Sequence, residues 1–313
     1  MKPTSLERYK RKARLALRGM RGFELYRGPS VLTGEPVVCL VQLATENTKL
    51  SADKSAWQTW ILRADIEPAD AYQNGAGDES ICGRCFWRAR PGEKAGPCYV
   101  MRYVITAVYK SWKRENYLSL QELADRIDPT LSHRRILEIV GALAGSVRLG
   151  AYGDPLAMPI GPQQALLRHV ATTQAFTHSW ADERATDKAA WKNIAMASCE
   201  TPAQVIEAMR AGWRTYTAFP QELTRAQAIA AIRKTAELMI AEKPALAYCP
   251  AAVKGSGITC DTCPIQCDGQ AYAASVGPTA RRPLHVINAI HGARAIMARY
   301  NSRGLLNEWR AVL

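Results

Sequence analysis

The chain has 313 residues, 48% of them hydrophobic and 22% charged, and a formal net charge of +13. This is a globular composition, and it excludes a disordered, collagen-like or coiled-coil chain. No stretch reaches the roughly 18 uninterrupted apolar residues of a membrane span, and the basic N-terminus lacks the apolar run of a signal peptide. We therefore expect a soluble, cytoplasmic protein with no membrane partner.

Positive charge is concentrated at the N-terminus. Residues 1–28 carry nine basic and two acidic residues, a net charge of +7. We expect residues 1–30 to form a basic arm, and such an arm attracts polyphosphates by counterion release. A contact with nucleic acid and a merely solvated arm both fit, and a membrane-surface helix fits less well because Trp and Phe are missing from its apolar side.

The middle of the chain alternates strand and helix signals. Strands are predicted at residues 58–65, 146–152, 174–180, 193–200 and 213–219. Helices are predicted at 99–114, 119–128, 133–145, 161–173, 201–212 and 223–243, with a capping box at Ser119 and Glu122 and an N-cap at Thr201. A further helix is expected from Leu284 to Val312, where several arginines recur.

Such alternation predicts an α/β fold with parallel strands, either an open sheet or a full or partial (β/α) barrel, over residues 31–248. Functional side chains of such folds lie at the carboxyl ends of the strands. Three candidate catalytic residues lie at or just after the ends of predicted strands: Asp154, His178 and Cys199. A strand-end histidine acts as a ligand or proton donor, although many are only hydrogen-bonded at the sheet edge.

Seven of the nine cysteines fall into two short groups, which in a cytoplasmic protein favours metal binding over disulfides. The first group, Cys82, Cys85 and Cys98, has the spacing Cys-x2-Cys-x12-Cys. Three ligands leave one coordination position open for a substrate or cofactor. A fourth ligand could come from Cys39, Cys199 or His178, although Cys39 lies in an apolar run typical of the core.

The second group has four cysteines with the spacing Cys-x10-Cys-x2-Cys-x3-Cys: Cys249, Cys260, Cys263 and Cys267. Four thiolates complete a tetrahedral zinc site or saturate a four-iron cluster. We therefore expect residues 249–313 to form a cysteine-rich metal-binding module followed by the C-terminal helix.

A strand, a three-cysteine loop, a helix and a second strand ending in RLGAYGDP together resemble the radical S-adenosylmethionine enzymes. The patterns TWILRAD, ICGRC, CYV, RLGAYGDP, the strand with Thr177, His178 and Trp180, GWRT and the CPA–C–C–C group also resemble a group of uncharacterised bacteriophage and prophage proteins, over roughly residues 55–270. The chain departs from the usual family loop, Cys-x3-Cys-x2-Cys, and has aspartate where the family turn has glutamate.

The resemblance implies that Cys82, Cys85 and Cys98 bind a [4Fe–4S] cluster, and that Gly150, Gly153 and Asp154 bind the aminoacyl end of S-adenosylmethionine. It also implies a second metal centre in the four-cysteine group, as auxiliary modules of many members have. The first hypothesis is thus an iron–sulfur enzyme that acts on nucleic acid or a modified nucleobase in the cytoplasm of a phage host. The alternatives are a non-catalytic, zinc-stabilised nucleic-acid-binding protein of phage replication or regulation, and a metal-dependent hydrolase.

Overall fold

The computed structural model describes residues 5–73, 77–89, 93, 96–98, 100, 102–239, 244–253, 255–263, 267, 284–289 and 304–313. The strands are β1 (Gly22–Pro29), β2 (Pro36–Gln42), β3 (Trp57–Arg63), β4 (Tyr117–Leu118), β5 (Ser146–Tyr152), β6 (Thr172–Thr177), β7 (Met196–Cys199), β8 (Thr215–Phe219), β9 (Ala245–Tyr248) and β10 (Leu284–Ala289). The α-helices are α1 (Ser5–Ala16), α2 (Pro68–Gln73), α3 (Glu79–Cys82), α4 (Arg102–Lys113), α5 (Leu120–Ile127), α6 (His133–Gly141), α7 (Ile160–Leu167), α8 (Lys188–Trp191), α9 (Pro202–Arg210), α10 (Arg225–Met239) and α13 (Leu305–Ala311). Short 3-10 turns are η1 (Pro155–Ala157), η2 (Ser179–Ala181) and η3 (Pro250–Ala252).

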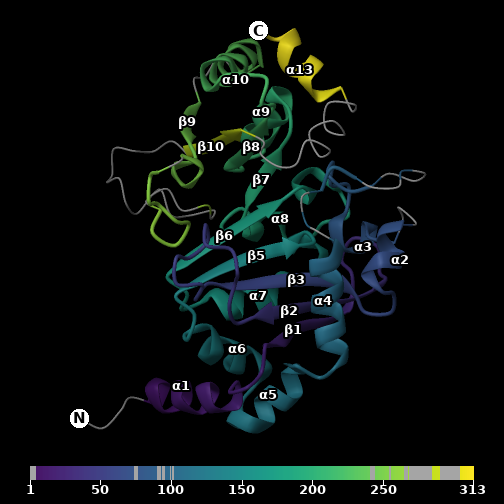
Figure 1. Ribbon diagram of the computed structural model, residues 1–313, viewed down its shortest axis with the longest axis vertical. Coiled ribbons are helices and arrows are strands. Elements are labelled where there is room, and N and C mark those ends of the chain that lie inside the picture. The colour runs from purple at the N-terminus through teal and green to yellow at the C-terminus, as the bar shows by residue number, and fades with distance from the viewer. Residues whose placement is uncertain are drawn as a thin grey trace.

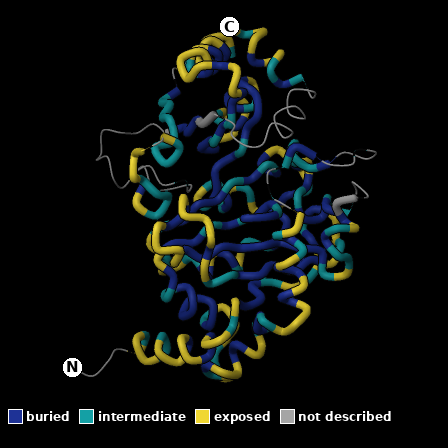
Figure 2. The backbone as a smooth tube through the Cα atoms, viewed as in Figure 1, coloured by how far each residue is buried: buried dark blue, intermediate teal, exposed yellow. Residues whose placement is uncertain are grey.

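The strands form one sheet of ten, in the order β4-β1-β2-β3-β5-β6-β7-β8-β10-β9 (Figure 1). β1, β2 and β3 form an antiparallel meander, and every pairing from β3 through β5, β6, β7, β8 and β10 to β9 is parallel. All seven residues of β3 are buried, as expected of a strand covered on both faces. Figure 2 shows the strands buried through the centre of the molecule.

The predicted α/β class and the parallel strands are confirmed, but a barrel is not shown. Among the described residues the outer strands β4 and β9 do not pair with each other, and they lie at opposite ends of the sheet. The reason is visible at β3, the first strand of the parallel run. One edge of β3 pairs with β5 and the other with β2, so the position that the last strand of a closed barrel would occupy is already filled.

The sheet also crosses both domain boundaries expected from the sequence. β1 belongs to the basic N-terminal segment and pairs with β2, and β10 belongs to the C-terminal segment and pairs with β8 and β9. The helix predicted from Leu284 is wrong at its start, because residues 284–289 form a buried parallel strand. His285, Val286 and Ile287 are each 1% exposed, and the neighbouring strands on both sides outweigh any helical preference. Residues 305–311 are helical, as expected, and residues 290–303 lie outside the described part of the chain.

No helix in the described part of the chain has both the length and the apolar character that crossing a membrane requires.

Candidate functional site

The first cysteine pair sits in a tight turn at the end of α3. Cys82 is the last residue of that helix, and the backbone N–H of Cys85 donates to the Cys82 carbonyl oxygen at 3.1 Å. Gly83, between them, has φ +54°, and a Cβ there would lie 2.7 Å from the Ser179 hydroxyl of the loop after β6. Only glycine fits this conformation and this contact, so the turn is pressed against the carboxyl end of β6.

Cys98 lies near this pair after twelve intervening residues. A Cβ on Gly96 would lie 2.4 Å from the backbone of residues 88 and 89, so the end of the loop packs directly against an earlier part of it. Burial, and then the neighbouring sulfur of Cys85, raise the pKa of Cys98 to about 12. Burial, followed by Asp78, Cys85 and Cys98, raises the pKa of Cys82 well above its ordinary value.

The three thiols are therefore electrostatic neighbours, as the spacing predicts. In the part of the chain that the structure describes, however, no three Cys, His, Asp or Glu side chains are close enough to surround one metal ion. The donor set itself fits a thiophilic metal, since three thiols lie as electrostatic neighbours at the sheet edge, with His178 beside Cys85. Metal binding would have to displace the thiol protons and draw the side chains together.

The turn after β5 packs against the same helix. Gly150 and Gly153 have φ +66° and +83°, and a Cβ on Gly153 would lie 2.7 Å from the Ile61 side chain and 3.1 Å from the Ile81 carbonyl oxygen. The N–H of Asp154 donates to that same carbonyl at 2.6 Å. Ile81 immediately precedes Cys82, so the Gly-Asp-Pro turn holds the backbone that carries the first thiol.

Asp154 is 5% exposed, and both oxygens of its carboxylate accept several hydrogen bonds. Oδ2 accepts from the backbone N–H groups of His178 and Ser179 at 2.8 and 3.0 Å and from the Ser179 hydroxyl at 3.0 Å. Oδ1 accepts from the Thr177 hydroxyl at 2.8 Å and from the Leu156 N–H at 3.0 Å. Both oxygens are occupied by the protein, which gives Asp154 a positioning role between the ends of β5 and β6.

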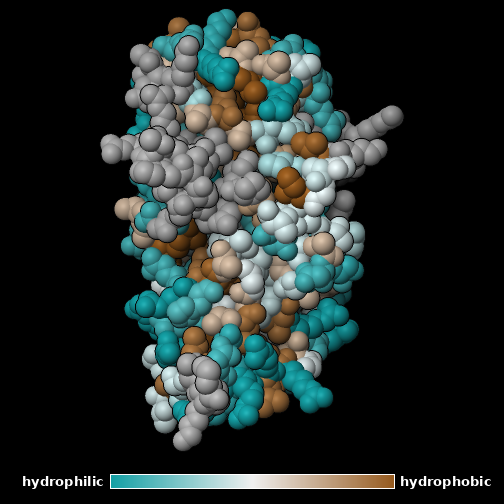
Figure 3. All heavy atoms as spheres, turned by 90° about the vertical axis from the view of Figure 1, so that its left-hand side faces the viewer, coloured by the Kyte–Doolittle hydropathy of each residue, from teal (hydrophilic) through white to brown (hydrophobic). Residues whose placement is uncertain are grey.

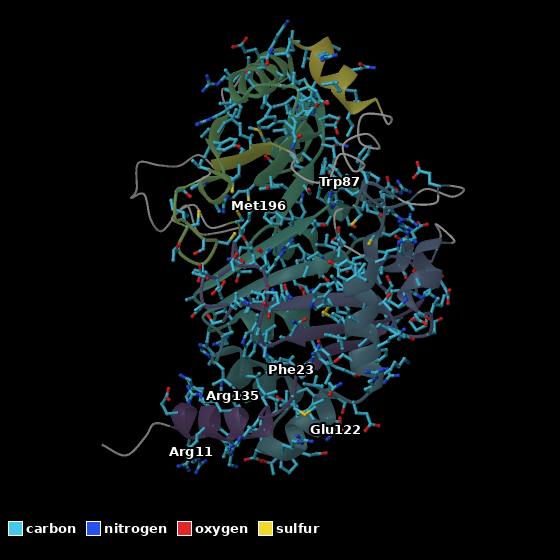
Figure 4. The ribbon with its side chains drawn as sticks, viewed as in Figure 1. Arg11, Phe23, Trp87, Glu122, Arg135 and Met196 are labelled. Carbon is cyan, nitrogen blue, oxygen red and sulfur yellow. The ribbon has the colours of Figure 1, made fainter. Side chains whose placement is uncertain are left out.

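His178 stands between the cysteine loop and the end of β7. Its Nε2 lies 2.9 Å from Glu200 Oε1, within ion-pair distance but out of line for a hydrogen bond. Burial alone would lower the pKa of His178, but the Cys85 sulfur and the Glu200 carboxylate outweigh it and raise the pKa well above its ordinary value. The indole N–H of Trp87, labelled in Figure 4, donates to the same Glu200 oxygen at 3.1 Å. Glu200 thus connects the end of β7 to both His178 and the cysteine loop.

A cavity of about 390 Å³ opens at this point. Its wall includes Cys85, His178 and Glu200, together with Arg84 and Gln204. Its size matches the lower end of ordinary small-molecule sites. The cavity offers a thiol, an imidazole, a carboxylate and a guanidinium to whatever enters it.

Cys199 directly precedes Glu200 in the sequence, but its thiol has different surroundings from those of the cysteine loop. It is 1% exposed, and burial followed by Glu200 and Glu207 raises its pKa well above its ordinary value. A thiol in such surroundings stays protonated and is a poor nucleophile. Cys39 is likewise buried in β2, as expected of a core residue, and its pKa is raised to about 12 by burial.

In Figure 1 the segment of the second cysteine group that follows β9 lies at the left of the sheet, whereas α3 lies at its right. Cys249 follows β9, and the N–H groups of Cys260 and Asp261 donate to the carbonyls of Lys49 and Leu50, in the segment that precedes β3. Burial and then the other three thiols raise the pKa of Cys267 well above its ordinary value, against the nearby Arg214. All four thiols are thus neighbours, and Arg214 and Arg148 supply positive charge that favours thiolates.

Sequence reasoning placed Asp154, His178 and the three thiols at one edge, and the structure brings them together there. Glu200 is expected at this edge too, at the end of a predicted strand, but the sequence assigns it no role. Asp78, the buried acid at the N-terminus of α3 that pairs with Arg88 at 2.9 Å, was missed. Comparison of the chain with protein-family models, with curated proteins and with solved structures finds no match.

Proposed function

We propose that this protein is an iron–sulfur enzyme of the radical S-adenosylmethionine kind, with Cys82, Cys85 and Cys98 as the ligands of a [4Fe–4S] cluster. One observation carries the proposal: the three thiols are electrostatic neighbours at the carboxyl edge of parallel strands, and the Gly-Asp-Pro turn of the next strand packs against the helix that carries Cys82. Five parallel strands, β3, β5, β6, β7 and β8, succeed one another across the sheet in chain order, after which β10 lies between β8 and β9. A partial (β/α) barrel has the same succession of strands, and its ligands bind at this edge.

The chain's own residues would shape the site as follows. Gly150 and Gly153 keep the turn flat against β3 and α3, which leaves backbone groups near the thiols for the aminoacyl end of S-adenosylmethionine. Asp154 fixes the turn and the backbone of His178 rather than contacting the cofactor. When bound, the cluster supplies the electron that reductively cleaves S-adenosylmethionine. His178, oriented by Glu200, faces the cavity in which a substrate would lie.

The four-cysteine group is proposed as a second centre, because its thiols complete a ligand set without leaving an open position. We assign it electron transfer or structural support, because four thiolate ligands leave no coordination position for a substrate.

The test is anaerobic purification followed by iron and sulfide analysis. The wild-type protein should be brown, with broad visible absorbance that bleaches on reduction. Cys98→Ala should lose about half of the iron and sulfide, because one of two equal clusters is lost. Cys39→Ala and Cys199→Ala, the same substitution at buried core thiols, should keep all of it. Full iron retention in Cys98→Ala, or a colourless protein without iron, would refute the assignment.

A second candidate is favoured by the position of His178. A histidine that lies beside the Cys85 thiol and within 2.9 Å of a buried carboxylate resembles a zinc ligand with its outer-shell partner. The first group would then be a closed Cys3His zinc site, and the protein a zinc-stabilised binding protein. In that case His178→Ala removes one zinc and Glu200→Gln weakens zinc affinity by about 10- to 100-fold. The iron–sulfur proposal instead expects His178→Ala to retain its iron.

A further inference from the structure

The outer side of helix α1 carries a row of arginines. Arg8, Arg11 and Arg14 recur every three residues, and Arg18 follows in the turn after the helix. With 3.6 residues per turn, these positions share one side of the helix. All four are exposed, and within the described residues none has an ion pair with an acidic side chain. Figure 2 shows the outer side of α1 exposed.

The inner side of α1 is fixed to the body of the protein. Ala13, Ala16 and Leu17 are 0–6% exposed and belong to the main core. Lys12 donates to the carbonyl oxygen of Ile127 at the end of α5, and Arg126 donates to that of Ala16 at the end of α1. Each helix thus satisfies a C-terminal carbonyl of the other. The apolar side of α1 is not available for insertion into a membrane, so the membrane-surface alternative loses its physical basis.

A second group of arginines continues the charge. α1 packs against α6, and α6 packs against α7. From these two helices Arg134, Arg135 and Arg168 converge on the single carboxylate of Glu138, at 3.4, 2.9 and 3.9 Å. Their side chains remain 41–77% exposed, so three cations share one anion at the surface. Arg11 and Arg135 lie at the same end of the molecule in Figure 4, and Figure 3 shows hydrophilic side chains gathered over it.

A cavity of about 1080 Å³ opens beside this second group. Arg27, Arg134 and Arg168 are among its lining residues, and no cysteine is. It lacks thiol ligands, so it is not a second candidate for the metal chemistry. It does provide a recess in which a phosphate chain can approach the arginines from the side.

Among the described residues this face has no fully exposed aromatic side chain, since Tyr26, which lines the cavity, is half-buried. The large exposed apolar side chains there and elsewhere are Leu15, Tyr103, Leu238, Val253 and Leu313, and only Leu15 belongs to α1. Tyr9, the aromatic residue of α1, is half-buried and donates its hydroxyl to Asp128 at 3.1 Å. Single-stranded nucleic acids are held by stacking on aromatic rings, whereas duplexes are held by their phosphates.

We propose that the outer side of α1, together with Arg134, Arg135 and Arg168, is a surface that binds the phosphate backbone of duplex nucleic acid without reading its sequence. The named cations offer forked donors that match phosphate geometry. The inference adds a partner to the proposed function and does not depend on the metal centre.

The test is fluorescence anisotropy of the full chain with two labelled DNA duplexes of unrelated sequence, between about 50 and 200 mM salt. The variant R8Q/R11Q/R14Q removes three charges from α1 and keeps good helix formers. The control R233Q/K234Q/R310Q removes the same net charge from exposed positions on α10 and α13, at the opposite end of the molecule in Figure 1. Iron content, measured on the same preparations, reports separately on the metal centre.

Both duplexes should bind the wild type equally. The α1 variant should bind at least about tenfold more weakly at 100 mM salt, with a log–log salt dependence shallower by roughly 2 to 3. The control variant should stay within about twofold of the wild type. Equal losses in both variants would show that net charge alone attracts the duplex, and would overturn the inference. Tighter binding of single strands, or α1-dependent binding to phosphatidylglycerol vesicles that matches or exceeds duplex binding, would also overturn it.

Discussion

Replacing Asp154 with asparagine tests whether this residue holds the site together or contacts a cofactor. The substitution keeps the size and shape of the side chain but turns one acceptor oxygen into an NH2 donor. On the Oδ2 side that NH2 would face two backbone N–H groups, those of His178 and Ser179. The side chain will therefore place its remaining oxygen there and its NH2 on the Oδ1 side.

On the Oδ1 side the NH2 meets the Leu156 N–H, now without an acceptor at 3.0 Å, in a residue that is 1% exposed. A buried donor left unsatisfied costs about 1–3 kcal/mol. The bonds that remain at the other oxygen change from charge-assisted to neutral and lose part of their strength, although the loss of a buried charge offsets some of this. We expect Asp154→Asn to reduce the free energy of unfolding by about 2–3 kcal/mol.

Urea unfolding monitored by tryptophan fluorescence measures this change, with Asp125→Asn as the matched control. Asp125 is exposed on α5, where the same substitution should stay within about 0.5 kcal/mol of the wild type. Asp154→Asn should also retain less iron, because the Asp154 carboxylate anchors the Ser179 segment, against which Gly83 packs between Cys82 and Cys85. If the variant is as stable as the wild type and loses only affinity for S-adenosylmethionine, Asp154 is a cofactor ligand and the positioning role is refuted.

Three further predictions concern the surrounding framework. His285, 1% exposed, accepts from Thr215, and burial followed by Arg214 lowers its pKa to about 4. In the unfolded chain the pKa of His285 is about 6.5, so on acidification the unfolded state takes up a proton before the folded state does. The stability that this difference contributes is complete above about pH 6.5, and roughly 2–3 kcal/mol of it is lost on acidification to pH 4.5. His285→Asn should remove this pH-dependent part of the stability from urea unfolding curves. Gly153→Ala should cost about 1–3 kcal/mol more than Gly34→Ala, because both have φ near +80° but only Gly153 lacks room for a Cβ; equal costs in thermal unfolding would disprove the crowding. Trp309→Phe should cost about 1–3 kcal/mol, because it leaves the Glu200 carbonyl without its 2.8 Å donor, whereas an unchanged midpoint in urea would mean that solvent replaces that bond.

The elements predicted best from the sequence are those whose signals are local. The capping box at Ser119 and Glu122 forms as expected, and the Thr201 side chain accepts from the Gln204 N–H at the start of α9. Strand 146–152 was predicted with its observed limits. In each case the residues that determine the structure lie within a few positions of one another, so one sequence window contains the whole cause.

The elements that were missed depend on distant partners. β1 lies in a segment whose charge predicts an arm, yet Phe23 and Leu25 are fully buried once β2 pairs beside them. β10 is a strand only because β8 and β9 flank it. At the site, cysteine spacing revealed the thiols, and the strand end placed Glu200 at the edge, whereas the contacts of Glu200 with Trp87 and His178 arise only on folding.

The order of the strands explains why the site can be assembled from so few residues. β5, β6 and β7 are neighbours both in the chain and in the sheet, so the loop that ends each strand lies beside the loop that ends the next. Asp154, after β5, therefore reaches the backbone that follows β6, and Glu200, after β7, reaches back to His178. In a doubly wound sheet this succession would break where the strand order reverses. Here it continues from the turn that holds Ile81 to the carboxylate that holds Trp87, so the segment with Cys82 and Cys85 is tied on either side to one continuous row of strand ends.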